Sequence, residues 1–276
     1  KKIFIILITI GALFAISFLV SKIGPTTQEK IENKIAVIPL KGTITVEGGS
    51  ADFLGSGGAS STRIIELIHE AENDESVKGI IFEINSPGGG VVASEEITNA
   101  IKETNKPTIA WIREVGASGA YWIASATDAI VADPLSITGS IGVLSSYLEF
   151  GGLLDKYNVT YERLVSGNYK DTGTPFRDLK EDERTILQRK LDIVHDYFIS
   201  DVAENRDMNK EKVQELATGM FYLGSEAQEL GLVDYLGGKD KAIDVIKELT
   251  GLEEVELVSY QERRSIFDLL QRVSAF

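Results

Sequence analysis

The sequence predicts an α/β protein with a parallel sheet and helices packed outside it. Three apolar, β-rich runs each lead into a turn of small residues: residues 77–85 lead to a triple glycine, residues 108–113 to Ser118, and residues 129–133 to Gly139. We expect a helix after each turn. Because strand-turn-helix repetition gives parallel strands, all three turns should meet at the carboxyl edge of the sheet, where such folds gather function.

The elements before and between these units are also predicted from pattern. Residues 35–40 and 44–46 are expected to form strands, and residues 48–61 a Gly/Ser-rich loop with little apolar content. Apolar residues recur at helical spacing over residues 62–72, and residues 91–104 follow the triple glycine as a second predicted helix.

The second half of the body is predicted as one long helix followed by short pieces. Residues 181–205 form a charge-rich helix whose charges are interpreted as a solvated face. The domain is expected to run over residues 35–260. Short alternating helices and strands complete it, at residues 227–230, 233–236, 239–250 and 255–260. Residues 261–276 are predicted to be an amphipathic tail.

The N-terminus predicts a membrane anchor. Residues 3–20 carry no charge and would span roughly 27 Å as a helix, close to the hydrocarbon thickness of a bilayer. A cleavable signal peptide is the alternative, but no small-x-small site follows. We therefore expect a transmembrane segment at residues 1–22 and a linker at residues 23–34. The flanking lysines favour a cytoplasmic N-terminus and a body outside the cell membrane.

Composition narrows the possible chemistry. The chain of 276 residues has 42 acidic against 28 basic residues, a net charge of −14, and shows no basic cluster, so nucleic acid is not an expected partner. It has no cysteine, which excludes disulfides, thiolate nucleophiles and cysteine-bound metals.

Ser118 is the candidate nucleophile. It lies in a small-residue stretch between a predicted strand and a predicted helix, where the free N–H groups of a helix N-terminus stabilise negative charge on an oxygen. The alternative is that Ser118 is an ordinary N-cap residue.

The spacing of the triple glycine at residues 88–90 does not fit a phosphate-binding loop. Two other interpretations of this loop remain. Glycines allow backbone N–H groups to approach a substrate carbonyl, so this loop could form half of an oxyanion hole, with the N–H of Gly119 as the other half. The alternative is a turn that is required sterically.

A serine nucleophile needs a base, and the two histidines are poor candidates. His69 lies among polar neighbours and His195 lies within the long predicted helix, so both are interpreted as surface or structural residues. A lysine can serve instead if desolvation keeps its amine uncharged. Lys170 stands out because it lies in a loop directly after a predicted strand at residues 161–165, although a surface lysine remains the alternative.

Four ordered motifs give the chain a resemblance to the signal peptide peptidase A family of S49 serine proteases. The resemblance covers residues 35–238 and corresponds to the short, single-repeat form of the family. The motifs are NSPGGG at 85–90, ASGAYWIA at 117–124, TGSIGV at 138–143 and SGNYKD at 166–171, followed by PFR at 175–177.

This resemblance implies a Clp-protease/crotonase-like fold of repeated β-β-α units and a serine-lysine dyad. Ser118 would be the nucleophile, Lys170 the general base, and Ser140 the residue that orients the lysine amine. The N–H groups of Gly89 and Gly119 would bind the oxyanion. No metal or cofactor is required. Because the serine and lysine of one site can come from neighbouring units in this family, a homo-oligomer is expected.

The implied substrates are remnant signal peptides and other apolar peptides, cut at the membrane. Three alternatives stay open: a related membrane serine protease that cleaves stomatin-like proteins, a crotonase-type acyl-CoA binder, and a non-catalytic assembly.

Asp171 is a difficulty for this assignment, because a carboxylate beside Lys170 favours the charged amine. If the two residues lie in extended backbone, their side chains point to opposite sides, and replacing Asp171 by Asn should change activity little.

Overall fold

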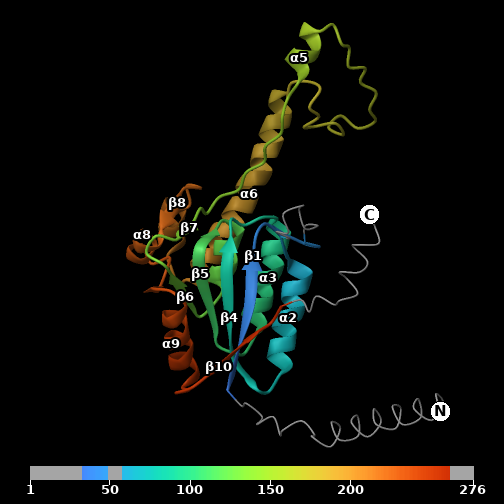
Figure 1. Ribbon diagram of the computed structural model, residues 1–276. Coiled ribbons are helices and arrows are strands. Elements are labelled where there is room, and N and C mark those ends of the chain that lie inside the picture. The colour runs from blue at the N-terminus through green and yellow to red at the C-terminus, as the bar shows by residue number, and fades with distance from the viewer. Residues whose placement is uncertain (1–32, 49–57, 262–276) are drawn as a thin grey trace, which may run out of the picture.

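The computed structural model describes residues 33–48 and 58–261 (Figure 1). No helix within these ranges is both long and apolar enough to cross a bilayer. The predicted anchor at residues 3–20, most of the linker and the predicted tail lie outside the described residues.

A mostly parallel sheet forms the centre of the body. Its strands run in the order β10, β1, β4, β5, β6 and β9, and every neighbouring pair along this path is parallel. Their bounds are Glu256–Ser259, Lys34–Lys41, Val77–Ser86, Thr108–Ala117, Ala129–Ala132 and Tyr235–Leu236. The predicted α/β class with a parallel sheet is confirmed.

Short strands extend the sheet at its carboxyl edge. β7 (Ile137–Gly139) pairs in parallel with the end of β5, and β8 (Phe221–Leu223) pairs antiparallel with β7. β2 (Ile44–Thr45) and β3 (Ala59–Ser60) form a separate two-stranded sheet, so part of the predicted Gly/Ser-rich loop is a strand.

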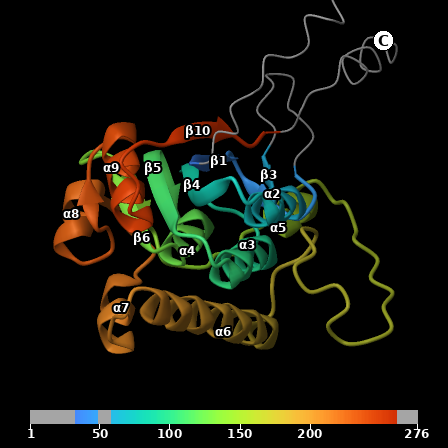
Figure 2. The same cartoon turned by 90° about the horizontal axis from the view of Figure 1, so that it is seen from below.

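Helices cover both faces of the sheet. The larger core packs α2 (Ser61–Asn73), α3 (Val91–Glu103) and α4 (Gly119–Ser125) against one face, whereas α9 (Lys239–Thr250) covers part of the other. Figure 2 shows α6 (Glu181–Asn205) in a further layer beyond α3 and α4. Two small helices, α7 (Lys210–Leu216) and α8 (Gly224–Glu229), complete the fold. The bounds of α6 and α9 are those predicted from the sequence, whereas α7 and β8 were not predicted.

Residues 144–180 and the first half of α6 project from the body as an arm, with α5 (Gly151–Lys156) near its tip (Figure 1). Two sequence predictions fail here. The run at residues 161–165 is not a strand, because no strand of the sheet lies beside it on the arm. The third predicted unit also fails, since β6 is followed by β7 and an extended run instead of a helix.

The arm is attached to the body through the second half of α6. Phe198 is buried and stacks on Trp122 of α4, with ring centroids 4.5 Å apart. Lys102 of α3 forms an ion pair with Asp201, whose carboxylate also accepts a hydrogen bond from the Trp122 indole. Apolar and charged contacts together hold α6 against α3 and α4.

We expect Phe198→Ala to destabilise the chain by about 3–5 kcal/mol, because the substitution leaves a cavity between α6 and α4. Denaturant unfolding measures the change. Ile193→Ala is the matched control on the same helix, since Ile193 is 64% exposed, and it should have little effect. Equal midpoints for Phe198→Ala and the unsubstituted chain would show that this contact does not hold α6.

Candidate active site

Ser118 lies on a strained turn between β5 and α4. Its backbone has φ 54° and ψ −126°, a combination that L-residues rarely adopt. Its N–H donates to Gly139 O at 2.8 Å, which ties the turn to β7. The side chain is half-buried and makes no capping hydrogen bond, so the alternative of an ordinary N-cap serine is wrong. A strained strand-to-helix turn of this kind holds a serine hydroxyl out toward substrate.

The triple glycine packs directly against this turn. A Cβ on Gly88, whose φ is +96°, would lie 2.7 Å from Gly119 N and 2.9 Å from Ser118 Cβ. A Cβ on Gly89 would lie 2.0 Å from Ile44 O. These positions therefore require glycine because two backbone segments approach them from opposite sides.

A parallel bridge with Ile44 orients the glycine loop. Ile44 N–H donates to Gly88 O at 2.9 Å, and Gly90 N–H donates to Ile44 O at 2.8 Å. Alternation along an extended chain then turns the Gly89 N–H away from Ile44, toward the side of the Ser118 turn.

The N–H groups of Gly89 and Gly119 form a pair of available donors. Gly119 is the first residue of α4, so its N–H has no acceptor within the helix. Among the described residues, neither N–H takes part in a backbone hydrogen bond outside the regular elements. An ideal Cβ on Gly119 lies 3.4 Å from Gly89 N, which means that the two backbones are in contact. Two such donors beside a serine can stabilise an oxyanion.

Ser140 lies next to Ser118 because β5 and β7 are in register. Ala117 pairs with Gly139, and each serine directly follows its paired residue. Ser140 has φ 51°, and its hydroxyl donates to Gly219 O at 3.0 Å. The Ser140 oxygen can still accept a hydrogen bond from an amine. The sheet thus brings Ser118, Ser140, Gly89 and Gly119 to one place.

Lys170 is not brought to this place within a single chain. It lies in a series of turns on the arm, is exposed, and forms no side-chain hydrogen bond or ion pair with the described residues. The arm is bonded to Glu183 near the start of α6. Glu183 lies about 22 Å along the helix from Phe198, where α6 meets the body, so the part of the arm that carries Lys170 is held away from the body. His69 is exposed on α2, whereas His195 is partly buried on α6, and neither imidazole forms a hydrogen bond with Ser118 within the described part of the chain.

Asp171, the neighbour of Lys170, is held by two arginines. Arg163 binds its carboxylate through two nitrogens, at 2.6 and 2.7 Å, and Arg177 donates to it at 3.1 Å. These hydrogen bonds lower the pKa of the Asp171 carboxyl. Arg177 also binds Glu183 and lowers the pKa of that carboxyl to about 2. The hypothesis of extended backbone at Lys170 and Asp171 does not hold, because both residues lie in turns.

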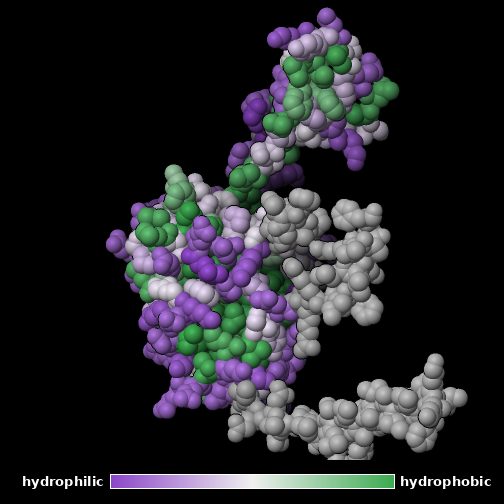
Figure 3. Space-filling view, in the orientation of Figure 1, coloured by the Kyte–Doolittle hydropathy of each residue, from purple (hydrophilic) through white to green (hydrophobic). Residues whose placement is uncertain are grey.

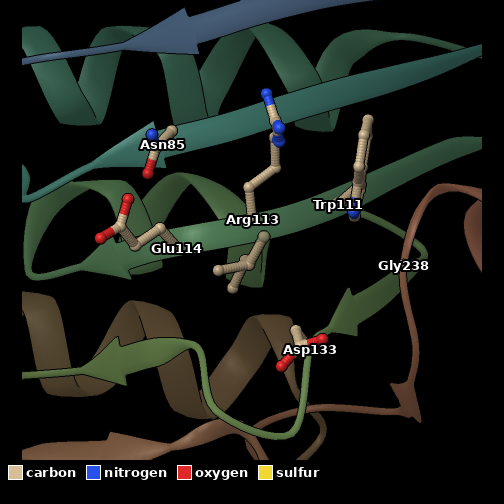
Figure 4. Close-up of a pocket in the computed structure, with 7 residues that line it drawn as sticks. Asn85, Trp111, Arg113, Glu114, Asp133 and Gly238 are labelled. Atoms are coloured by element: carbon tan, nitrogen blue, oxygen red, sulfur yellow. The ribbon is translucent and has the colours of Figure 1, made fainter.

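The pocket in Figure 4 is separate from the Ser118 turn. It is an open hollow of about 360 Å³, lined by polar side chains such as Asn85, Glu114 and Asp133 and by Trp111. Trp111 belongs to the side of the sheet that α9 covers, whereas α4 lies on the other side. The pocket lining contains no serine or lysine.

Within residues 33–48 and 58–261, no group of three or more histidine, aspartate or glutamate residues could hold a metal ion.

Two family models match the chain. The model described as peptidase family S49 matches residues 100–253, and that described as the N-terminal domain of NfeD1b matches residues 34–149. Together they cover the body and the arm.

Several of the similar proteins carry the names of proteases. A putative protease of Methanocaldococcus jannaschii is 35% identical over 74% of this chain and 67% of its own length. A putative signal peptide peptidase SppA of Enterococcus faecium is 33% identical over 86% of this chain and 70% of its own length. A solved structure of a membrane-bound stomatin-specific protease, in a mutant form, shares the fold with a TM-score of 0.54 at 17% identity. The similarity covers 83% of this chain and 98% of that one.

We expect Gly88→Ala to slow the reaction of Ser118 with a serine-directed acylating probe by about 100-fold, since the added methyl group must displace the oxyanion donors. Adduct formation at Ser118 is measured by mass spectrometry. Gly238→Ala is the matched control, because nothing lies within 4 Å of a Cβ there. Equal labelling rates for the two variants would contradict the proposed role of the glycine loop.

Acid should loosen the arm. The folded-state pKa values of Asp171 and Glu183 are depressed, so their ion pairs stabilise the arm fully above the unfolded values near 4. This contribution is lost as pH falls toward the folded values. Hydrogen–deuterium exchange at about pH 6 and about pH 3, corrected for intrinsic rates, should show lost protection across residues 163–183 but not in α9. Unchanged protection of the arm at the lower pH would contradict this.

Proposed function

This chain belongs to peptidase family S49, and from that premise we propose that it is a serine endopeptidase with a dyad of Ser118 and Lys170. Family membership makes it a peptidase and confirms the resemblance seen in the sequence motifs. The observation that carries the rest of the proposal is the strained Ser118 turn, with the free N–H groups of Gly89 and Gly119 beside it.

The proposed reaction has two stages. Ser118 Oγ attacks the peptide carbonyl carbon while the Lys170 amine takes its proton, and the two backbone N–H groups stabilise the negative oxygen. The lysine then returns the proton to the leaving amine, which completes an ester on Ser118. Water, deprotonated by the same amine, hydrolyses that ester and releases the acid product. Ser140 would accept a hydrogen bond from the amine and orient it.

We propose that the lysine reaches the serine of another copy in a homo-oligomer. Between residues 144 and 176 the arm exposes large apolar side chains, including Leu144, Leu148, Tyr157 and Leu164, and α5 has no buried residue. Figure 3 shows this apolar surface on the projecting part of the molecule. A surface of this kind favours contact with a partner. A second copy would cover it and supply Ser118 to the exposed Lys170.

The proposed substrates are apolar peptides, such as remnant signal peptides, cut beside the membrane. The name of the Enterococcus faecium relative supports this class. An anchor at residues 3–20 would hold the domain at the extracytoplasmic side of the cell membrane. The Clp-protease/crotonase-like assignment of the fold remains part of the proposal.

A second candidate is cleavage of stomatin-like proteins, which the name of the protein in the similar solved structure favours. A panel of fluorogenic peptides separates the two. A stomatin-directed protease should strongly prefer apolar stomatin-derived segments over signal peptides. A signal peptide peptidase should cut signal peptides at least as well as the stomatin-derived segments.

The dyad is tested by complementation. Ser118→Ala and Lys170→Ala chains should each be inactive, since each lacks one half of the dyad. Mixed before assembly in equal amounts, they should recover about a quarter of the wild-type rate if each site takes its serine and lysine from different copies. Cleavage of an apolar fluorogenic peptide gives the rate, and size-exclusion chromatography verifies assembly.

Activity in either single variant would exclude that residue from the dyad. If both variants are inactive and the mixture also stays inactive although it assembles, the serine and lysine act within one copy. A wild-type chain that assembles but does not react with an acylating probe would instead favour a non-catalytic assembly.

A further inference from the structure

We propose that Asp171, Arg163, Arg177 and Glu183 form a positioning cluster that sets the place of Lys170. This inference rests on the proposed function, because it concerns the base of that reaction. None of the four residues is proposed to touch substrate.

Each charged side chain of the cluster pairs with an oppositely charged side chain of the same cluster. Arg163 makes two bonds to the Asp171 carboxylate, through Nε at 2.6 Å and one Nη at 2.7 Å. Arg177 makes two bonds to Glu183, at 2.7 and 2.8 Å, and donates from Nε to Asp171 at 3.1 Å. Paired bonds between a guanidinium and a carboxylate fix orientation as well as distance. Asp171 and Glu183 are nearly or fully buried although they lie on a projecting arm.

These bonds hold the backbone on both sides of Lys170. Arg163 donates to Asn168 O at 3.2 Å, two residues before the lysine. After the lysine, Asp171 is held by both arginines, and Thr172 Oγ1 donates to Glu183 at 3.2 Å. The turn that carries Lys170 is thus fixed at both ends, while the lysine side chain stays exposed.

The same bonds join the turn to the body. Glu183 belongs to the first turn of α6 and also accepts a hydrogen bond from the Lys180 N–H at 3.0 Å. α6 is one continuous helix of 25 residues whose other end packs on α4. The cluster therefore fixes Lys170 relative to the body through a rigid helix rather than through a flexible loop.

The cluster also removes the difficulty of a carboxylate beside a catalytic lysine. Two arginines neutralise the two carboxylates of Asp171 and Glu183, and both oxygens of Asp171 are occupied by guanidinium groups. The Asp171 carboxylate is thus neutralised by arginines, and the described residues show no ion pair between it and Lys170. Contrary to the expectation from sequence, we expect Asp171→Asn to lower activity, since the amide would release Arg163.

The experiment measures kcat and KM for an apolar fluorogenic peptide with the full chain in its assembled form. Asp171→Asn and Arg177→Lys should each lower kcat by about ten-fold or more and leave KM nearly unchanged, because the base is displaced while the substrate contacts remain. Arg177→Lys keeps the charge but cannot form the paired bonds to Glu183.

Asp234→Asn is the matched control. Asp234 forms a similar two-bond pair with Arg206 on the body, at 2.6 and 2.9 Å, and takes no part in the proposed site. It should lower the unfolding midpoint of the chain without lowering kcat. As a further readout, Asp171→Asn added to Lys170→Ala should not slow probe acylation of Ser118 any further, because the cluster acts through Lys170.

The possible outcomes separate this inference from the proposed function. A wild-type chain that does not cleave, or a Lys170→Ala variant that does, defeats the proposed function itself. If the dyad stands but assembled Asp171→Asn and Arg177→Lys keep kcat within about two-fold of wild type, the positioning cluster is wrong. An additional loss on top of Lys170→Ala would also overturn it. If Asp171→Asn does not assemble, the kcat of Arg177→Lys alone decides whether the positioning cluster is correct.

Discussion

The close approach of two backbones at the carboxyl edge of the sheet is the constraint on which the candidate site depends. The glycine loop after β4 lies against the turn after β5, so closely that a methyl group on Gly88 would meet Gly119 N at 2.7 Å. The Ile44 bridge holds the loop from one side, and the Gly139 carbonyl holds Ser118 from the other. The unfavourable φ of Ser118 persists because these surroundings over-determine it.

The body and the arm contribute different parts of the proposed chemistry. The body holds the nucleophile and the oxyanion donors in a rigid parallel sheet, with a large apolar core on one face. The arm has almost no core of its own, and its order around Lys170 comes from charged pairs. Under the proposed function, a site divided in this way would be complete only where the arm of one copy reaches the body of another, and activity would require assembly.

The chain's family is shown by sequence similarity, whereas the site is argued from geometry. The structural similarity at 17% identity concerns the fold alone. The chemistry proposed for the Ser118 turn rests on φ, ψ and the backbone donors beside it, and does not depend on which peptide is the substrate.

Much of the fold and half of the site could be predicted from sequence because their signals are local. Apolar periodicity predicted α2, and the bounds of α6 and α9 were also predicted from the sequence. Small residues after apolar runs marked the turns at Gly88 and Ser118. The strand predicted at residues 161–165 failed because a strand needs a partner, and that partner's presence is not a local property. For the same reason β8, which pairs only with β7, was missed.

The sequence by itself thus marked Ser118 and the glycines as candidates, because small residues at a turn are a local signal, and its motifs pointed to Lys170 through a family resemblance. Only the tertiary structure decided their arrangement. It brought Ser140 beside Ser118 through the register of β7 on β5, and it placed Lys170 on the arm instead of beside the serine. It also paired Arg163 and Arg177 with Asp171 and Glu183, because contacts between residues distant along the chain depend on how the elements pack.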